Sequence, residues 1–105
     1  MSLTSKQRAF LKSMAMTMVP VQYFGKASLT DENLKNVDEA LAARELIKLG
    51  VQKNCEDAPR EIAEAIAART NAEIVQVIGR KIVLYREGED DKKRIELPRG
   101  SRGDL

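Results

Sequence analysis

The chain has 105 residues, of which 43% are hydrophobic and 32% are charged, and its formal net charge is +2. A chain of this size fits one domain around one core, which we expect over residues 1–98, followed by a disordered tail over 99–105. Because the sequence contains no histidine and only one cysteine, Cys55, it excludes an internal disulfide and a Ser-His or Cys-His catalytic dyad. We therefore expect no enzymatic activity, metal or cofactor.

The chain begins with a predicted helix. Thr4 and Gln7 have the three-residue spacing of a capping box, and apolar residues recur behind them at helical spacing. Lys6, Arg8 and Lys12 are spread through this segment, which is unlike the charged start and apolar stretch of a secretion signal. No apolar run in the chain approaches the roughly 20 residues of a membrane span. The sequence therefore predicts a cytoplasmic protein that does not bind a membrane.

The next predicted element is a short strand that leads into a capped helix. Residues 19–24 are rich in β-branched and aromatic types, and Pro20 favours a position at the edge of a sheet. A loop over 25–28 follows, after which Thr30 can cap a second helix that should end near Arg44.

Another strand and helix follow. Residues 45–51 alternate in character, which predicts a strand with apolar side chains on one face and Lys48 on the other. A third helix should open at Glu56 or Asp57, since Pro59 is tolerated in the first turn of a helix, and it should end near Asn71.

Two strands, 72–78 and 81–86, complete the predicted fold, and their connection is so short that they must form an antiparallel hairpin. The run 82–85 is apolar without alternation, which predicts a central strand covered on both faces. A further short strand is expected over 94–97. The order α-β-α-β-α-β-β, with two right-handed crossovers, predicts a two-layer α+β domain with helices two and three on the same face of the sheet.

Charge is unevenly distributed along the chain. Residues 1–30 carry four cations and no acid, and residues 76–86 carry three cations and no acid, while many of the acids gather in 31–39 and 56–64. This segregation predicts either one basic face suited to a polyanion or two ordinary solvated helices, and charge alone leaves both interpretations open.

Three blocks of sequence carry the functional signal. They are Phe24-Gly25-Lys26-Ala27-Ser28 ahead of a helix, Arg44-Glu45-Leu46-Ile47-Lys48, and Val77-Ile78-Gly79 leading into 82–86. The first combines flexible backbone, a cation and a helix N-terminus, as phosphate sites commonly do. In residue types and in spacing over roughly residues 3–98, the blocks resemble the YhbY family of bacterial RNA-binding proteins. The single domain of that family is the chloroplast RNA splicing and ribosome maturation (CRM) domain.

The resemblance implies a mixed four-stranded sheet similar to that of the C-terminal domain of translation initiation factor three, with the last strand inserted antiparallel between the second and third. It also implies structured ribosomal RNA as the ligand and a role in maturation of the large ribosomal subunit, on precursor particles. We expect a monomer. The alternative from another class is an adaptor that binds a ribosomal or assembly protein through its sheet or acidic helices.

In the family the first loop usually reads Gly-x-x-Gly, a pattern shared with the KH domain, in which this loop clamps the nucleic-acid backbone. Here Ser28 replaces the second glycine, at a position where a serine would resist positive φ, although its hydroxyl could serve a phosphate or help to cap the helix. Asp31 and Glu32 offset the dipole of the helix that follows. The candidate RNA contacts are Gly25, Lys26, Ser28, Arg44, Lys48, Arg80, Lys81, Arg86, Lys6 and Lys12.

Several of these residues also have structural interpretations. Arg44 is as well suited to cap the end of the second helix as to contact RNA, and exposed lysines and arginines are often merely solvated. Tyr23, Phe24 and Tyr85 are candidates for base stacking, but aromatic residues inside strands more often belong to the core.

Overall fold

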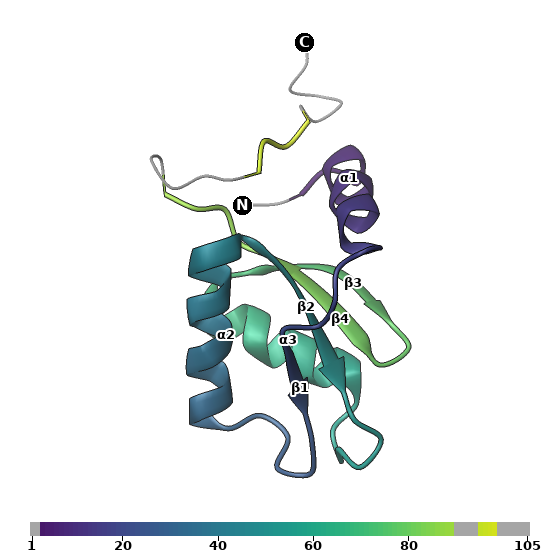
Figure 1. The fold of residues 1–105 in the computed structure, drawn as a ribbon, viewed down its shortest axis with the longest axis vertical. Helices are drawn as coiled ribbons and strands as arrows, with labels where there is room; N and C mark the ends of the chain where they lie inside the picture. Colours follow the sequence, from purple (N-terminus) through teal and green to yellow (C-terminus); the bar gives the residue numbers. More distant parts are fainter. Residues whose placement is uncertain (1–2, 90–94, 99–105) are drawn as a thin grey trace.

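The computed structural model describes residues 3–89 and 95–98. Its four-stranded sheet has the order β1-β2-β4-β3, in which β1 runs parallel to β2 and β4 runs antiparallel to both of its neighbours (Figure 1). The predicted element order and the predicted insertion of the last strand are therefore confirmed. The elements are α1 (Ser5–Ala15), β1 (Gln22–Phe24), α2 (Asp31–Arg44), β2 (Leu46–Val51), α3 (Pro59–Thr70), β3 (Glu73–Ile78) and β4 (Lys81–Tyr85).

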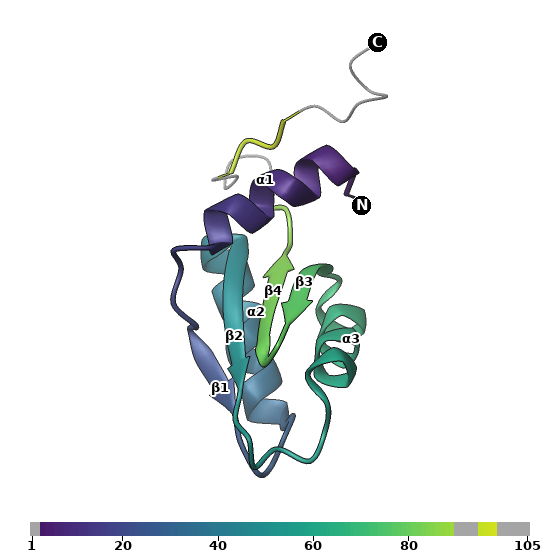
Figure 2. The same cartoon turned by 90° about the vertical axis from the view of Figure 1, so that its right-hand side faces the viewer.

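Helices α2 and α3 cover one face of the sheet, as the two crossovers predict, which confirms the two-layer α+β architecture. Helix α1 adds to it by crossing one end of the opposite face (Figure 2). None of the helices in the described part of the chain is long and apolar enough to cross a membrane.

The core is divided between the two faces of the sheet. Ile82 and Leu84 belong to the larger cluster under α2 and α3, whereas Val83 and Tyr85 belong to the smaller cluster under α1. Side chains alternate between faces along a strand, so this division means that β4 is buried on both sides. The apolar run without alternation is explained by this position.

The N-termini of the first two helices form as predicted. The Gln7 N–H donates to Thr4 Oγ1 and the Thr4 N–H donates to Gln7 Oε1, each at 3.1 Å, which completes the capping box of α1. At α2, the Asn33 N–H donates to Thr30 Oγ1 at 3.1 Å. These side chains satisfy backbone donors that would otherwise lack a partner in the first turn.

The start of α3 differs from the prediction. Its N-cap is Ala58, followed by Pro59 at the first helical position, and neither Glu56 nor Asp57 caps it. The Glu61 carboxylate instead accepts the Ala58 N–H at 3.0 Å. Proline fixes a helical φ at this position without losing a needed N–H, so it sets the helix start. The predicted end is confirmed, since Asn71 adopts the left-handed conformation that closes a helix.

The strands also differ from the prediction. Strand β1 starts at Gln22 rather than at residue 19, although its predicted edge position is confirmed. Strand β2 starts at Leu46, because Glu45 takes φ 65° and leaves the strand path. Residues 95–97 form no strand, and Arg94 and the predicted tail over 99–105 lie outside the described residues.

The buried Glu45 side chain ties the C-terminal segment to the domain. Its carboxylate accepts the N–H groups of Gly88 and of Ile95, the latter at 2.7 Å, while its own N–H donates to Leu41 O at 2.9 Å. Gln7 Nε2 adds a second link by donating to Pro98 O at 3.1 Å. A buried carboxylate is stable only when its oxygens accept such hydrogen bonds.

We predict that Glu45→Gln lowers the free energy of unfolding by about 1–3 kcal/mol. The amide has the same size but replaces one accepting oxygen by an NH2 group, which cannot accept a backbone N–H of the C-terminal segment. Urea denaturation measures the change, and amide hydrogen exchange at Gly88 and Ile95 should accelerate. Glu39→Gln, at an exposed position of α2, is the control. An unchanged midpoint for Glu45→Gln would contradict this account of the carboxylate.

Tyr85 supplies a prediction about alkaline stability. Its hydroxyl is buried and has no hydrogen-bond partner among the described residues. Burial, reinforced by the negative charges of Glu45 and Glu87, raises the pKa of Tyr85 from the ordinary 10.0 to about 12. The unfolded chain then ionises first, so stability is intact below pH 10 and falls as the pH approaches 12.

In the Tyr23→Phe background Tyr85 is the sole tyrosine, because the chain has two. Absorbance of this variant should show tyrosinate only near pH 12 or upon unfolding. Tyr85→Phe should remove the tyrosine contribution to the alkaline loss of stability. Ionisation near pH 10 without unfolding would show that the hydroxyl reaches water.

Candidate nucleic-acid interface

Three chain connections meet at one end of the sheet. The Gln52 N–H donates to Phe24 O at 2.8 Å, the Val51 N–H donates to Arg80 O at 2.8 Å, and Arg80 Nη1 donates to Gln52 O at 3.2 Å. Parallel β1 and β2 finish at the same end of the sheet, and antiparallel β4 begins there, so the fold brings these connections together (Figure 1). We call this region, made of residues 25–28, 52–55 and 79–80, the loop end.

The loop end carries three exposed cations, Lys26, Lys53 and Arg80. Lys26 and Arg80 were predicted from the sequence as RNA contacts, whereas Lys53 was missed. Consecutive parallel strands place their following loops side by side, and this relation could have indicated Lys53. A Cβ at Gly25 would lie 2.8 Å from Gln52 Oε1, the end of an exposed side chain, so two of these loops lie close together.

The structure gives Ser28 a role inside the loop. It takes φ 58°, its hydroxyl donates to Asp57 Oδ2 at 2.6 Å, and its N–H donates to Gly25 O at 2.9 Å. Its carbonyl accepts from Asn33 Nδ2 at 3.1 Å. Because these bonds occupy the buried residue, its hydroxyl anchors the loop to the segment before α3 rather than pointing to solvent.

Lys48 and Lys81 lie on the sheet face that α2 and α3 leave open. The register pairs Tyr23 with Gly50 and Gly50 with Lys81, which puts these three positions side by side on that face. The Tyr23 ring lies over Gly50, where a Cβ would come within 2.4 Å of it. Lys81 Nζ is 5.7 Å from the ring centroid, a cation–π geometry.

Of the three aromatic residues that we considered for stacking, Tyr23 alone reaches solvent, with 51% of its surface exposed. Phe24 and Tyr85 are fully buried and belong to the core. Since Phe24 and Tyr23 are neighbours on one strand, the pleat decides which ring faces the core and which faces the open side.

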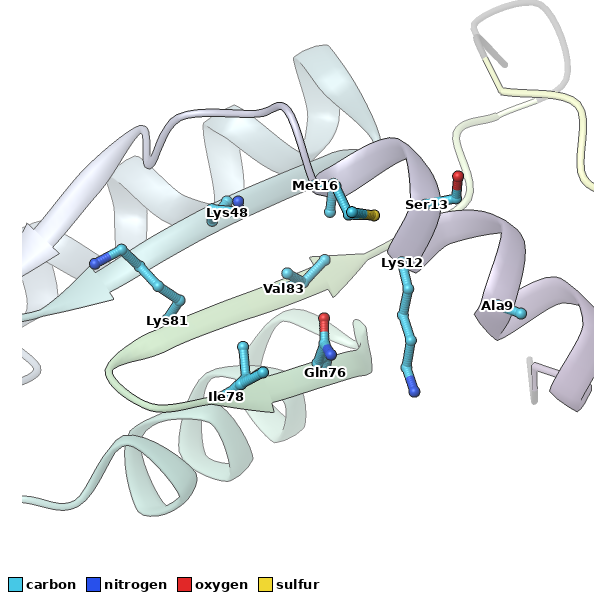
Figure 3. A pocket seen from close by; sticks show the side chains of 10 residues that line it. Ala9, Lys12, Ser13, Met16, Lys48, Gln76, Ile78, Lys81 and Val83 are labelled. Carbon is cyan, nitrogen blue, oxygen red and sulfur yellow. The ribbon is translucent and has the colours of Figure 1, made fainter.

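A groove of about 530 Å³ lies on the same open face, between α1 and the β3–β4 hairpin (Figure 3). Lys12 borders it from α1, and Lys48 and Lys81 border it from the sheet. None of the described residues that line it is acidic. Lys81 belongs both to the groove and to the surroundings of Tyr23, and it follows Arg80 in the chain. Lys81 thus links the groove to the loop end, and we call the two together the open basic face.

Three predicted contacts lie elsewhere. Arg86 donates to Asp38 Oδ1 at 2.6 Å and to Thr70 O at 2.9 Å, so its guanidinium joins the end of β4 to α2 and α3. Arg44 ends α2 at the opposite end of the sheet from the loop end, and Lys6 lies in the first turn of α1 and does not line the groove. The structure thus separates these three residues from the other candidates.

No group of three or more acidic, cysteine or histidine side chains in the described ranges could hold a metal ion. The groups that this surface offers to a ligand are lysine and arginine side chains, exposed backbone and one aromatic ring. Such a surface can bind a polyanion but holds no nucleophile paired with a base.

Known proteins share both the sequence and the fold. The YqeI protein of Bacillus subtilis, named a probable RNA-binding protein, is 45% identical over 96 residues, which cover 91% of this chain and 99% of that protein. A Haemophilus influenzae protein named as an RNA-binding protein is 40% identical over 98 residues, which cover 93% of this chain and 97% of that protein. These relatives are named for RNA binding and not for an enzymatic activity.

The solution structure of the hypothetical protein SAV1595 from Staphylococcus aureus matches this fold with a TM-score of 0.77 and 42% sequence identity. The match covers 92% of this chain and 100% of that structure. Residues 3–86 match the CRS1 / YhbY (CRM) domain. On its sequence, its fold and the length of these matches, the chain belongs to the CRS1/YhbY (CRM) domain family.

Proposed function

We propose that this chain is a non-catalytic RNA-binding protein that contacts structured ribosomal RNA mainly through the RNA backbone. We further propose that it acts in the cytoplasm, as a monomer, in maturation of the large ribosomal subunit. The observation that carries the RNA-binding part is the open basic face, on which cations from α1, β2, β4 and three loops gather without an acid among the groove's lining residues. A polyanion is the ligand that such a surface attracts.

Contact with the backbone is favoured by what the loop end offers. Lys26, Lys53 and Arg80 are exposed, and each can neutralise a phosphate without reading a base. Gly25 has no side chain to hold RNA away from the main chain of its loop. Binding of this kind depends on the spacing of phosphates, so it suits a folded RNA of defined shape.

The open sheet face can add stacking to these ionic contacts. Tyr23 is half exposed and has Lys81 beside its ring, so an RNA base could cover the free part of the ring. The choice of ribosomal RNA and of the large subunit rests on the family resemblance, because a basic surface alone does not distinguish among structured RNAs.

A protein-binding adaptor is the second candidate. The observation in its favour is the exposure of apolar side chains on the open basic face, with Met16 at 80% and Ile78 at 61%. Charge reversal separates the two candidates, since it should weaken binding to a polyanion and leave an apolar protein contact largely intact.

We predict that Lys26→Glu weakens binding to a structured ribosomal RNA fragment by about tenfold and lowers the slope of log affinity against log salt by about 1. The wild-type slope should correspond to roughly three to five phosphates at about 0.7–0.9 each. Lys35→Glu, which makes the same charge change at an exposed position of α2, should leave the slope unchanged. Equal slopes for wild type and Lys26→Glu, or no salt-dependent binding, would favour another surface or a protein partner.

We predict that Ser28→Gly binds the same RNA at least as tightly as the wild type. Glycine adopts the positive φ of this position freely, and the lost hydroxyl was bound to Asp57. Relief of strain and loss of one hydrogen bond should nearly cancel, leaving stability within about 1 kcal/mol. Titration and thermal melting measure both effects. A large loss of affinity in a folded variant would make the hydroxyl itself an RNA contact.

A further inference from the structure

The groove on the open basic face has apolar walls on both sides. Met16 stands at the end of α1 and is 80% exposed, and Ile78 stands at the end of β3 and is 61% exposed. Val83 of β4 lies between them on the floor (Figure 3). Large apolar side chains gathered around one hollow mark a binding site for a ligand with an apolar surface.

The positive charges at the rim of the groove favour a ligand that is also negatively charged. Lys12, Lys48 and Lys81 surround the apolar walls, and no described lining residue offsets their charge. A nucleotide combines a flat, largely apolar base with phosphates on either side of it. Its base suits the walls and its phosphates suit the lysines.

Two further features fit an unpaired base. The Gln76 amide lines the groove and carries both a donor and an acceptor, which a base edge can use. The groove volume of about 530 Å³ lies within the roughly 300–1,000 Å³ of small-ligand sites. Paired bases are stacked inside the A-form helix and cannot enter such a site, whereas a looped-out base can.

We propose that this groove takes one unpaired nucleotide of the bound RNA, with its base between Met16 and Ile78 and its flanking phosphates at the lysines. This inference rests on the proposed RNA-binding function and deepens it. The protein would then recognise a bulge or loop beside a helix, by shape rather than by sequence, while the loop end contacts the adjoining backbone.

The test compares two RNA hairpins that differ by one nucleotide. One has a fully paired stem, and the other carries a single unpaired adenosine in that stem. The groove variant is Met16→Gln with Ile78→Thr, which removes apolar wall without changing charge. Its matched control is Met14→Gln with Val19→Thr, since both of these residues are exposed and neither lines the groove.

We expect the wild type and the control variant to prefer the bulged hairpin by about tenfold, and the groove variant to prefer it by less than about twofold. The groove variant should still bind the paired hairpin with wild-type salt dependence, which shows that it is folded. Equal binding of both hairpins by the wild type, or equal loss of preference in both variants, would overturn the nucleotide site and leave the proposed function standing. Binding of neither hairpin would overturn both.

Discussion

Strand β4 lies at the centre of the sheet, with a paired strand on each edge and packed side chains on each face. Ile82 and Leu84 require the layer of α2 and α3, and Val83 and Tyr85 require cover from α1. Helix α1 covers one end of that second face, so the rest of the face stays open. The open basic face is thus a consequence of how β4 is buried, because the lysines line the part that α1 leaves uncovered.

Charged side chains have different roles at the two ends of the sheet. At one end the buried Glu45 carboxylate holds the C-terminal segment, and Arg86 joins β4 to α2 and α3. At the other end Lys26, Lys53 and Arg80 are exposed on short loops. Buried, hydrogen-bonded charges such as the Glu45 carboxylate stabilise one arrangement of the chain, whereas cations at the protein surface can attract a ligand.

The candidate site was only partly predictable. Lys26 and Arg80 stood out because they flank glycines in turns, and turns meet solvent. Arg86 carried the same charge in the same block, yet its guanidinium is bound to Asp38, which is remote in sequence. The groove was missed because its walls come from α1 and the hairpin, and no local pattern reports that two distant apolar side chains face each other.

The sequence by itself determined the elements and their order, because capping, periodicity and turn chemistry act over a few neighbouring residues. Thr4, Thr30 and Asn71 marked helix ends correctly for this reason, and the family resemblance supplied the strand order. Tertiary structure alone decided which polar groups became partners. Asp57 accepts a hydrogen bond from the Ser28 hydroxyl instead of capping α3, and Glu45 accepts hydrogen bonds from N–H groups more than 40 residues away. Such contacts depend on how the layers are assembled, which local sequence does not encode.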